Sequence, residues 1–427
     1  MPFLKNANLN VNIGLNQRIK ERNNPGIGDR GEIMGWNKVA IVGAGLIRFG
    51  ELFDKSAEVM IEEAYLNCIQ NVDKGFNPKD IQAAWVGACR PVLHGFHTIG
   101  GVTLTGSIGL AGVPCTHIEN GCPTGSDTFR NACMGVASGL YDVVLALGYE
   151  KMRDNSTAGM LGIAAQGHPV LQRGETAMTQ FAPQAVRHMY EYGTTKEQMA
   201  MVAVKNRHNG ALDPYSHYQQ EIVMQDVFNS PMVCYPLNLF DCCPQTDGAA
   251  AVIISRADIA HKYSDKPVYV AGVAMATDVP YMHEKENFTE FVASVRAAKK
   301  AYSMAGIRPQ DLDVVECHDC FSITEILNYE DLGLCTKGQG GKLVESGATQ
   351  IGGRIPVNPS GGLLTKGHPL GATGIAQMIE LYWQLREEVP KQNAKRQVAI
   401  KNGYALQHNV GGRGISNSVV TILTRNQ

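Results

Sequence analysis

The sequence predicts an α/β fold made of two related halves, and three observations support this. Continuous apolar runs such as Val143–Gly148 are typical of strands covered on both faces. Segments with apolar residues at three- and four-residue steps alternate with these runs, as amphipathic helices do. The same order of signals also occurs twice, because Lys38–Val42 and Pro78–Asp80 have counterparts in Val268–Val273 and Pro309–Asp311. A chain of 427 residues is also longer than one ordinary core requires.

Composition excludes several classes of function. The chain is 44% hydrophobic and 18% charged, with a net charge of −2, so neither nucleic acid nor an anionic membrane is expected as a partner. No apolar run reaches transmembrane length, and no basic-then-apolar signal peptide is recognised at the start. The 11 cysteines are scattered without the regular spacing of a disulfide framework. We therefore expect free thiols in a reducing cytoplasm.

The first half begins after a polar segment at 1–36, which we interpret as an arm that lies on the surface or on a partner subunit, or is loosely ordered. The first strand, Lys38–Val42, ends in Gly43-Ala-Gly45, which resembles the start of a dinucleotide-binding fingerprint. Arg48 stands where the third glycine of that fingerprint belongs, so we reject this interpretation. The further elements expected in this half are a helix at 56–71 and strands at Ile81–Val86, Val143–Gly148 and Asp247–Ser255.

Residues 150–235 interrupt the alternation of strands and helices. They are rich in Met, His, Gln and Tyr, and Thr194-Thr-Lys-Glu197 has the pattern of a capping box at a helix start. We expect a long insertion over the active face, where substrate selectivity would be set. The predicted organisation is an arm at 1–36, a first half at 37–262 that includes this insertion, and a second half at 263–427.

The second half repeats the elements of the first. Its expected elements are strands at Val268–Val273, Asp313–Glu316 and Ser418–Leu423, a helix around 290–305, and an apolar helix that opens at Pro369–Gly374 and continues to Leu385. The start of this last helix is the counterpart of Cys122-Pro-Thr-Gly125 in the first half. We therefore expect the two helix starts to face one site between the halves.

Cys122 is the candidate nucleophile, in the stretch Glu119–Asp127. It lies between Gly121 and Gly125, at the point where a turn meets the first turn of a predicted helix. The free N–H groups and the dipole of a helix start favour a thiolate over a thiol. The alternative is an inert cysteine of the core, since free cysteines are commonly buried.

Polar residues follow the predicted strands of the second half in three loops, at Cys317–Phe321, Asn358–Pro369 and Gln407–Gly414. Such strand-end loops converge on one crevice of a parallel sheet. The nucleophile needs a base, for which His368 is the candidate, and a developing oxyanion needs donors, which His318 or glycine N–H groups could supply.

Two groups in these loops, Cys320 and His408, are candidates for a second acid/base. The alternative for a histidine beside a proline is a hydrogen-bonded structural residue. Cys317 and Cys320 form a CxxC pair, but no second pair completes a zinc site, so no metal is predicted.

Four motifs together resemble the thiolase superfamily, in particular the sterol-carrier-protein-2-type thiolases. They are Cys122-Pro-Thr-Gly-Ser126, His318-Asp-Cys-Phe321, Gly367-His-Pro369 and Gln407-His-Asn409, in the family's order. The resemblance covers about residues 37–425. It implies a thiolase fold of two duplicated βαβαβαββ halves in a five-layered αβαβα arrangement, a homodimer, and a coenzyme A (CoA) ester as substrate.

The resemblance also implies roles for the candidate residues. Cys122 corresponds to the nucleophile that becomes acylated and His368 to the base that activates it. His318 corresponds to the oxyanion-hole residue for the thioester oxygen, and Cys320 to the second acid/base of this subfamily.

Two further positions correspond less directly. His408 falls where other thiolases have their second cysteine, and Gly411 or a neighbour corresponds to an N–H donor of the other oxyanion hole.

The expected reaction is cleavage of a 3-oxoacyl-CoA by CoA through an acyl-enzyme, or the reverse Claisen condensation. CoA would be a co-substrate, and no tightly bound cofactor is expected. Some family members work with a small OB-fold and zinc-ribbon subunit, as in the two-component benzoylsuccinyl-CoA thiolase. The alternatives are a retro-aldolase that acts on a CoA thioester with such a subunit, and a non-catalytic carrier of acyl-CoA or lipid.

Overall fold

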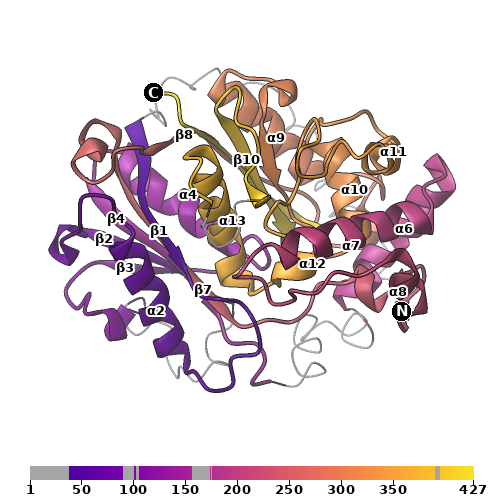
Figure 1. The fold of residues 1–427 in the computed structure, drawn as a ribbon, viewed down its shortest axis with the longest axis horizontal. Helices are drawn as coiled ribbons and strands as arrows, with labels where there is room; N and C mark the ends of the chain where they lie inside the picture. Colours follow the sequence, from indigo (N-terminus) through magenta and orange to yellow (C-terminus); the bar gives the residue numbers. More distant parts are fainter. Residues whose placement is uncertain (1–37, 90–100, 102–104, 156–173, 175, 390–394) are drawn as a thin grey trace, which may run out of the picture. The chain divides into compact units, whose positions relative to one another are not determined.

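The computed structural model describes residues 38–89, 101, 105–155, 174, 176–389 and 395–427, so the arm predicted at 1–36 lies outside the described residues. The described part contains a mixed sheet of nine strands in the order β3-β2-β4-β7-β1-β8-β11-β10-β9 (Figure 1). None of the described helices is both long and apolar enough to cross a membrane. The strands are β1 (Val39–Leu46), β2 (Ala83–Gly87), β3 (Cys115–Ile118), β4 (Val143–Glu150), β7 (Gly248–Arg256), β8 (Val268–Thr277), β9 (Val314–Glu316), β10 (Tyr404–Gly411) and β11 (Asn417–Thr424), with a separate hairpin of β5 (Met232–Cys234) and β6 (Leu237–Asn238).

The strand order confirms the predicted duplication. In the first half β2 pairs parallel with β3 and β4, and β7 runs antiparallel to β4 and β1. In the second half β9 pairs parallel with β10, and β11 runs antiparallel to β10 and β8. A parallel bridge between Val315 and Val357 occupies the place that β3 has in the first half. The two half-sheets meet where Ala40 and Ile41 pair with Tyr269 and Val268.

The helices give the predicted five layers. Helix α2 (Ala57–Gln70) packs on β1 and β7, and α9 (Val292–Ala305) packs on β8 and β11. Helices α4 (Thr124–Ala137) and α13 (Leu370–Leu385) pack against each other, with α4 on β2 and β4 and α13 on β4, β7 and β10 (Figure 1). The order is therefore α2, first half-sheet, α4 with α13, second half-sheet, α9. Because α13 is buried on nearly every side, its sequence is apolar almost throughout.

Glycines allow the backbones of this central layer to touch. A side chain at Gly148 of β4 would place its Cβ 1.9 Å from the carbonyl oxygen of Gly371 in α13. A Cβ at Gly125 of α4 would lie 2.6 Å from the same oxygen. This close approach brings the two predicted helix starts together, with Cys122 just before α4 and His368 just before α13.

Residues 150–235 contain more regular structure than the sequence analysis identified. Their described helices are α6 (Ala177–Tyr192), α7 (Lys196–Ala211) and α8 (Met224–Asn229). The capping box predicted at Thr194 and Glu197 is wrong by one residue, because Thr195 and Gln198 form it. The hydroxyl of Thr194 instead hydrogen-bonds Nδ1 of the buried His188 at 2.7 Å.

Helix α7 packs against the elements that flank the predicted catalytic loops, namely α10 (Ser322–Asp331), α11 (Gly340–Glu345) and α12 (Gly362–Lys366). The side-chain amide of Asn206 on α7 donates to Asp319 at 2.7 Å and to Glu325 at 2.6 Å. Asp319 in turn accepts the backbone N–H groups of Leu363 at 2.6 Å and Leu364 at 3.2 Å. These buried bonds tie the loop that contains His318 to the helix that precedes His368.

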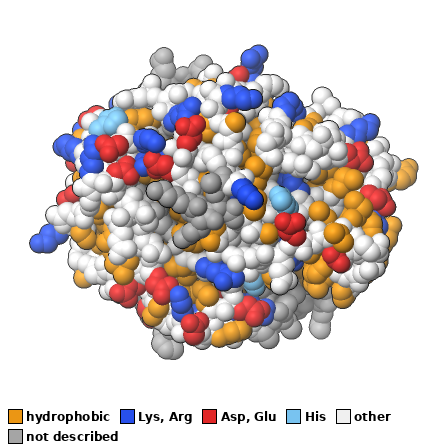
Figure 2. All heavy atoms as spheres, viewed as in Figure 1, with side chains coloured by type: hydrophobic (Ala, Val, Ile, Leu, Met, Phe, Trp, Pro, Cys, Tyr) orange, Lys and Arg blue, Asp and Glu red, His pale blue; other side chains and the backbone are white. Residues whose placement is uncertain are grey.

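Charges of both signs are distributed over the surface. Figure 2 shows Lys and Arg side chains interspersed with Asp and Glu over the face in view, in keeping with a net charge of −2. The face therefore has no broad single-sign field of the kind that binds nucleic acid.

Candidate active site

Cys122 lies immediately before Pro123, the N-cap of α4, and is partly exposed. The preceding Gly121 has a φ of +67°, which a residue with a side chain rarely adopts. Strand β10 ends against the thiol, because a Cβ at Gly411 would lie 2.5 Å from Cβ and 2.8 Å from Sγ of Cys122. The backbone N–H groups of Gly412 and of Cys122 itself hydrogen-bond the sulfur. The predicted neighbourhood of Cys122 and Gly411 is thus present in the structure.

Burial raises the pKa of the Cys122 thiol to about 11, even though the N–H groups of Gly412 and Cys122 act to lower it. The carboxylate of Glu150 raises this pKa further. The N–H groups thus favour the thiolate as predicted, but the loss of solvent outweighs them and the thiol stays protonated. A base must remove the thiol proton during the reaction.

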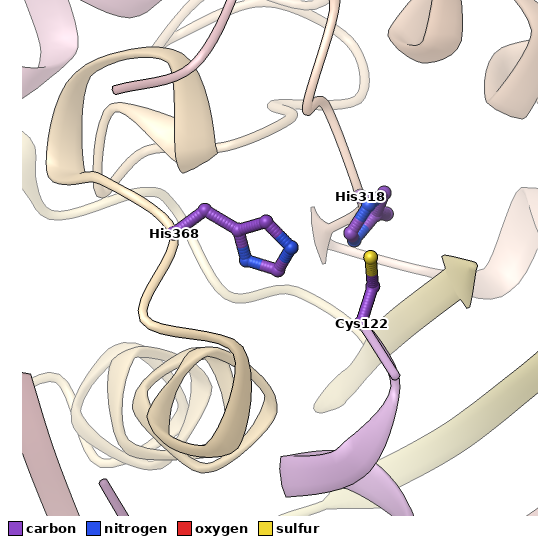
Figure 3. A group of neighbouring side chains, drawn as sticks. All are labelled: Cys122, His318 and His368. Carbon is purple, nitrogen blue, oxygen red and sulfur yellow. The ribbon is translucent and has the colours of Figure 1, made fainter. Parts of the chain in front are cut away.

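The rings of two histidines lie close to the thiol of Cys122. The sulfur of Cys122 and one ring nitrogen each of His318 and His368 all lie within 4.8 Å of one another (Figure 3). The two rings have centroids 5.0 Å apart and planes at 82°. Nε2 of each ring is buried and has no hydrogen-bond partner among the residues that the structure describes. The structure thus brings three of the predicted site residues, which come from three different parts of the chain, into one cluster.

The proton position on His368 follows from its partner. Nδ1 lies 2.8 Å from Oγ1 of Thr373, and that hydroxyl donates to the carbonyl oxygen of Pro369 at 3.0 Å. A carbonyl oxygen accepts hydrogen bonds and cannot donate them, so the threonine oxygen accepts the proton of Nδ1. Burial lowers the pKa of His368 to about 3, so the ring is neutral at physiological pH. Its Nε2 therefore presents a lone pair, as a base for Cys122 must.

Cys320 lies beside this cluster. Its carbonyl oxygen accepts the N–H of Cys243 at 2.9 Å, and its sulfur lies 3.8 Å from the hydroxyl of Thr324. Burial, followed by the neighbouring thiols of Cys243 and Cys122, raises the pKa of Cys320 well above its usual value. A thiol that stays protonated near the nucleophile can act as an acid.

His408 is not brought into the cluster. The segment around it was expected to be a loop, which is wrong, because Gln407–Gly411 lie inside β10. Successive side chains of a strand point to opposite faces. Asn409 faces the central layer, whereas Nε2 of His408 hydrogen-bonds the hydroxyl of Ser294 on α9 at 2.8 Å. Burial lowers the pKa of His408 to about 3.

Sequence reasoning missed two buried groups beside Cys122. The sulfur of Cys89 lies 3.2 Å from the hydroxyl of Thr124 and 3.3 Å from the carbonyl oxygen of Gly121. Glu150, at the end of β4, accepts the N–H groups of Cys89 at 3.0 Å and of Gly371 at 2.8 Å, which links the two helix starts. An acidic residue that ends an otherwise apolar strand was the available signal for Glu150.

A cysteine sulfur with two imidazole nitrogens is also a ligand set that zinc accepts. Cys122, His318 and His368 are the residues that could hold such an ion. The hydrogen bond to Thr373 and the N–H groups at the sulfur give the same residues a place in acyl transfer without a metal.

The comparisons with known proteins identify the family. Residues 39–234 match the model "Thiolase, N-terminal domain", and residues 274–425 match "Thiolase C-terminal domain-like". An acetyl-CoA acetyltransferase of Methanothermobacter thermautotrophicus is 44% identical over 377 residues, which cover 88% of this chain and 97% of the relative. Sterol carrier protein 2 of Bos taurus is 37% identical over 91% of this chain and 72% of its own length.

Two further matches are of interest for the site. The benzoylsuccinyl-CoA thiolase subunit BbsB of Thauera aromatica is 35% identical over 83% of this chain and 90% of its own length. Among solved structures, an Ltp2-ChsH2(DUF35) aldolase has a TM-score of 0.78 at 23% identity, over 92% of this chain and all of that chain. The latter identity shows a shared fold. The two family models, these relatives and the fold show that the chain belongs to the thiolase family of acyltransferases.

Proposed function

We propose that the protein is a thiolase that cleaves a 3-oxoacyl-CoA with CoA, or runs the reverse Claisen condensation, through an acyl group on Cys122. One observation supports this most strongly. The sulfur lies within 4.8 Å of a ring nitrogen of His368, whose Nε2 has a lone pair, and of a ring nitrogen of His318 from another loop. A thiol beside an uncharged base that can take its proton is an arrangement that nucleophilic catalysis by cysteine uses, and the raised pKa of Cys122 makes such a base necessary.

The first half-reaction begins with the deprotonation of Cys122. Nε2 of His368 takes the thiol proton, and Sγ of Cys122 attacks the 3-keto carbon. The N–H groups of Cys122 and Gly412, which already face the sulfur, donate to the oxyanion that forms on the keto oxygen. The C2–C3 bond then breaks, the acyl group stays on sulfur, and the shortened acyl-CoA leaves as an enolate.

The remaining groups complete the turnover. His318 donates to the enolate oxygen, and the Cys320 thiol protonates C2. CoA binds as the second substrate, and the Cys320 thiolate accepts its thiol proton. The CoA thiolate then takes the acyl group from Cys122, and protonated His368 returns its proton to the released Cys122 thiolate. Two half-reactions that share one acyl-enzyme give ping-pong kinetics.

Intact mass spectrometry after mixing with acetoacetyl-CoA tests the proposal. We expect one acetyl group on the wild-type protein, none on Cys122→Ala, and loss of the group when free CoA is added. If Cys122→Ala still cleaved a carbon–carbon bond of a CoA thioester, the protein would be a retro-aldolase instead. If no acyl donor of any chain length modified the wild type, the thiolase proposal would be rejected.

Arg207 on α7 supports CoA as the substrate, because its guanidinium is a nearly buried cation that could bind a phosphate. Its guanidinium lies over the rings of Tyr218 at 4.1 Å and Phe240 at 5.1 Å, and only 7% of the residue is exposed. No acceptor among the described residues binds it. Burial lowers the pKa of the neighbouring His217, Glu51 acts to raise it, and the charges of Arg153 and Arg207 lower it further. The backbone N–H of His217 donates to the carbonyl oxygen of Lys366, at the end of α12 just before His368, at 3.2 Å. We propose that a phosphate of CoA binds this guanidinium.

Substitution Arg207→Ala is expected to raise the KM for CoA about 10- to 100-fold, the value of one or two charge-assisted hydrogen bonds. The effect should be smaller for 3′-dephospho-CoA if the 3′-phosphate is the group bound. The surface variant Arg256→Ala removes a guanidinium that pairs with Asp142 and Asp258, so its KM should stay unchanged. Equal KM values for CoA in both variants would remove Arg207 from the CoA site.

We further propose a homodimer in the cytoplasm. Among the residues that the structure describes, β3 is the outermost strand of the first half-sheet and is partly exposed, so a second copy could pair with its outer edge. All eleven cysteines are free thiols, as a reducing compartment requires. We also propose a small OB-fold partner, because one relative, BbsB, is a subunit of benzoylsuccinyl-CoA thiolase and the structurally similar Ltp2-ChsH2(DUF35) aldolase has a second component.

A further inference from the structure

A buried chain of amide and hydroxyl groups ends at His318. Gln377 of α13 accepts from the side-chain amides of Gln407 at 2.9 Å and of Asn409 at 2.7 Å, both on β10. Ser126 of α4 accepts from Gln407 at 2.7 Å and donates to Oδ1 of Asn409 at 2.8 Å. The amide nitrogen Nδ2 of Asn409 lies 3.3 Å from Nδ1 of His318. All five side chains are buried.

The direction of these hydrogen bonds is fixed at one end. The oxygen and nitrogen positions of all three side-chain amides could be exchanged, with the serine hydroxyl rotated to match. Every side-chain hydrogen bond of the network would then still join a donor to an acceptor. The backbone breaks this ambiguity, because the same nitrogen of Asn409 lies 2.9 Å from the carbonyl oxygen of His408. A carbonyl oxygen can only accept, so this end of the amide is the NH₂ group and the other end is the oxygen.

The orientation of Asn409 determines where His318 holds its proton. The two hydrogens of this NH₂ group face three acceptors, namely Oε1 of Gln377, the carbonyl oxygen of His408 and Nδ1 of His318. An amide nitrogen cannot accept a ring N–H, so Nδ1 is the unprotonated nitrogen and the ring proton is on Nε2. That Nε2 has no partner among the described residues, and the ring lies against the sulfur of Cys122 (Figure 3), with one ring nitrogen within 4.8 Å of it. Since Nδ1 contacts Asn409, Nε2 is the nitrogen left for the site. His318 therefore presents a donor to the site.

The two histidines present opposite tautomers to the site. Thr373 leaves the Nε2 of His368 with a lone pair, whereas Asn409 leaves the Nε2 of His318 with a proton. One ring can then only take a proton from the reacting groups, and the other can only donate a hydrogen bond to them. Neither ring can substitute for the other without a change of tautomer.

We propose that Asn409 is a positioning residue that holds His318 as the Nε2–H tautomer, and so makes it a hydrogen-bond donor to the thioester oxygen of the substrate. The proposal rests on the proposed thiolase function for its kinetic consequence. Its structural content, the tautomer, does not depend on any reaction. Burial, followed by the nearby His368 and His408, lowers the pKa of His318 well below its usual value, so the ring stays neutral and has a definite tautomer.

The first test reads the tautomer directly. Long-range ¹H–¹⁵N spectra of the full chain labelled with ¹⁵N-histidine distinguish the two neutral tautomers, and His318→Gln identifies the signals that belong to this ring. We expect the wild-type ring to be protonated at Nε2 and to remain neutral between pH 6 and pH 8. A wild-type ring protonated at Nδ1 would overturn the proposal without any variant.

The second test reverses the polarity of the contact. In Asn409→Asp a carboxylate oxygen replaces the NH₂ group, so the ring is expected to move its proton to Nδ1. The lost donor should lower kcat about 10²- to 10³-fold, the usual effect of removing one oxyanion-hole donor, and leave KM nearly unchanged. Asn71→Asp makes the same change at the exposed end of α2 and should alter neither the tautomer nor kcat.

The outcomes separate the two proposals. If Asn409→Asp kept both the Nε2–H tautomer and the wild-type kcat, Asn409 would not be a positioning residue. If the tautomer changed as expected but the wild type formed no acyl-enzyme with any donor, the thiolase proposal would fail while the assignment of Asn409 would stand. Asn409→Leu, which offers neither donor nor acceptor, should give a mixture of tautomers and an intermediate kcat.

Discussion

Replacement of His368 by glutamine is expected to lower the rate of Cys122 acylation about 10²- to 10⁴-fold at neutral pH, the usual range for loss of a general base. The reason is that the Cys122 thiol is almost entirely protonated at neutral pH. With a pKa of about 11, only about one Cys122 in 10⁴ is ionised at pH 7 unless a base removes the proton. Glutamine keeps the size and polarity of the side chain but cannot take up a proton.

The pH dependence gives the sharper distinction. In His368→Gln the reactive thiolate must form by free ionisation, so the residual rate should rise about tenfold for each pH unit between pH 6 and pH 9. The wild-type rate should lack this slope, because burial lowers the pKa of His368 to about 3 and the base stays unprotonated over the whole interval. Single-turnover acylation measured by rapid quenching at several pH values provides the comparison.

A matched control is His208→Gln, which removes an exposed histidine that pairs with Glu221 at the surface. This variant should retain the wild-type rate and its pH profile. A His368→Gln variant with a flat pH profile would show that another group deprotonates Cys122.

The sequence predicted the parts of the site that depend on local signals. The turn before α4 needs Gly121 at positive φ, and the repeated apolar helices need small residues where they touch. Such requirements select glycine and other small residues at particular positions, so they can be recognised in the sequence. They sufficed to place Cys122 opposite His368 and to predict that the loop with His318 reaches the same crevice.

Other features depend on the surroundings and could not be predicted. Whether His408 or Asn409 faces the nucleophile depends on which alternate residues of β10 point to the central layer. The run Gln407–Asn409 is polar throughout, so it has no alternation of apolar and polar residues from which the inward face could be predicted. The raised pKa of Cys122 depends on how completely the folded chain excludes water from the sulfur. The proton positions on His318 and His368 depend on partners that are distant in sequence or hidden in the first turn of α13.

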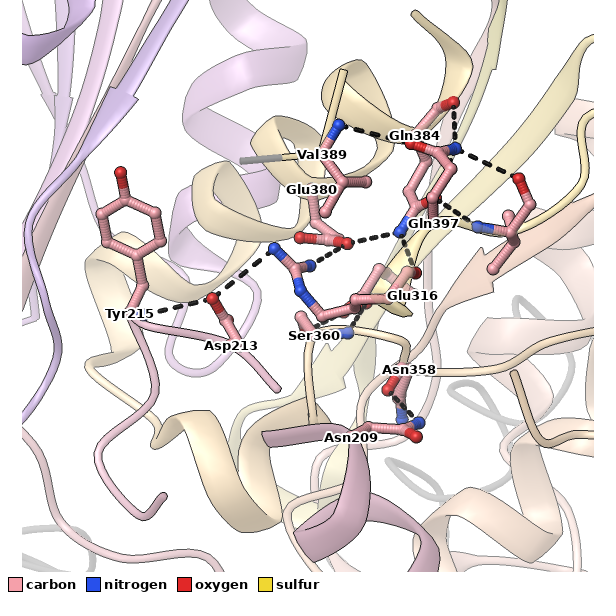
Figure 4. A network of polar contacts seen from close by, with 12 residues as sticks. Asn209, Asp213, Tyr215, Glu316, Asn358, Ser360, Glu380, Gln384, Val389 and Gln397 are labelled. Carbon is pink, nitrogen blue, oxygen red and sulfur yellow. Dashed lines mark hydrogen bonds and ion pairs between the residues drawn. The ribbon is translucent and has the colours of Figure 1, made fainter. Parts of the chain in front are cut away.

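A second group of buried polar and charged side chains, which includes Asp213, Glu316 and Glu380, forms a network of hydrogen bonds and ion pairs (Figure 4). Arg396 is fully buried and pairs with Glu380 of α13 and with Asp213, whose carboxylate lies 3.6 Å away. Asp213 also pairs with Lys366 at 3.3 Å. Glu316, at the end of β9, accepts the N–H and hydroxyl of Ser360, and burial followed by the charge of Glu380 raises the pKa of Glu316 to about 8.

Substitution of Arg396 by methionine is expected to lower the free energy of unfolding by about 3–5 kcal/mol at pH 8, because two buried carboxylates lose their shared cation. The deficit should shrink as the pH falls toward 5. In the wild type burial acts to raise the pKa of Asp213, but Lys366 and Arg396 together lower it, so this carboxylate stabilises the fold above the pKa of an unfolded aspartate. Without Arg396 the pKa of Asp213 rises, so the penalty grows with rising pH and a bound proton relieves it at lower pH.

Urea unfolding of both proteins at pH 5 and pH 8 measures this difference, with Arg425→Met as the control. Arg425 is partly exposed and pairs with Glu387 at 3.5 Å, so its removal should cost about 0–1 kcal/mol at either pH. A deficit in Arg396→Met that did not depend on pH would show that lost packing, not charge, causes the loss.

We also expect slower acylation of Cys122 in Arg396→Met, since Asp213 would hold Lys366 less firmly. Only Gly367 separates Lys366 from the base His368 in the chain, so a displaced Lys366 would shift His368.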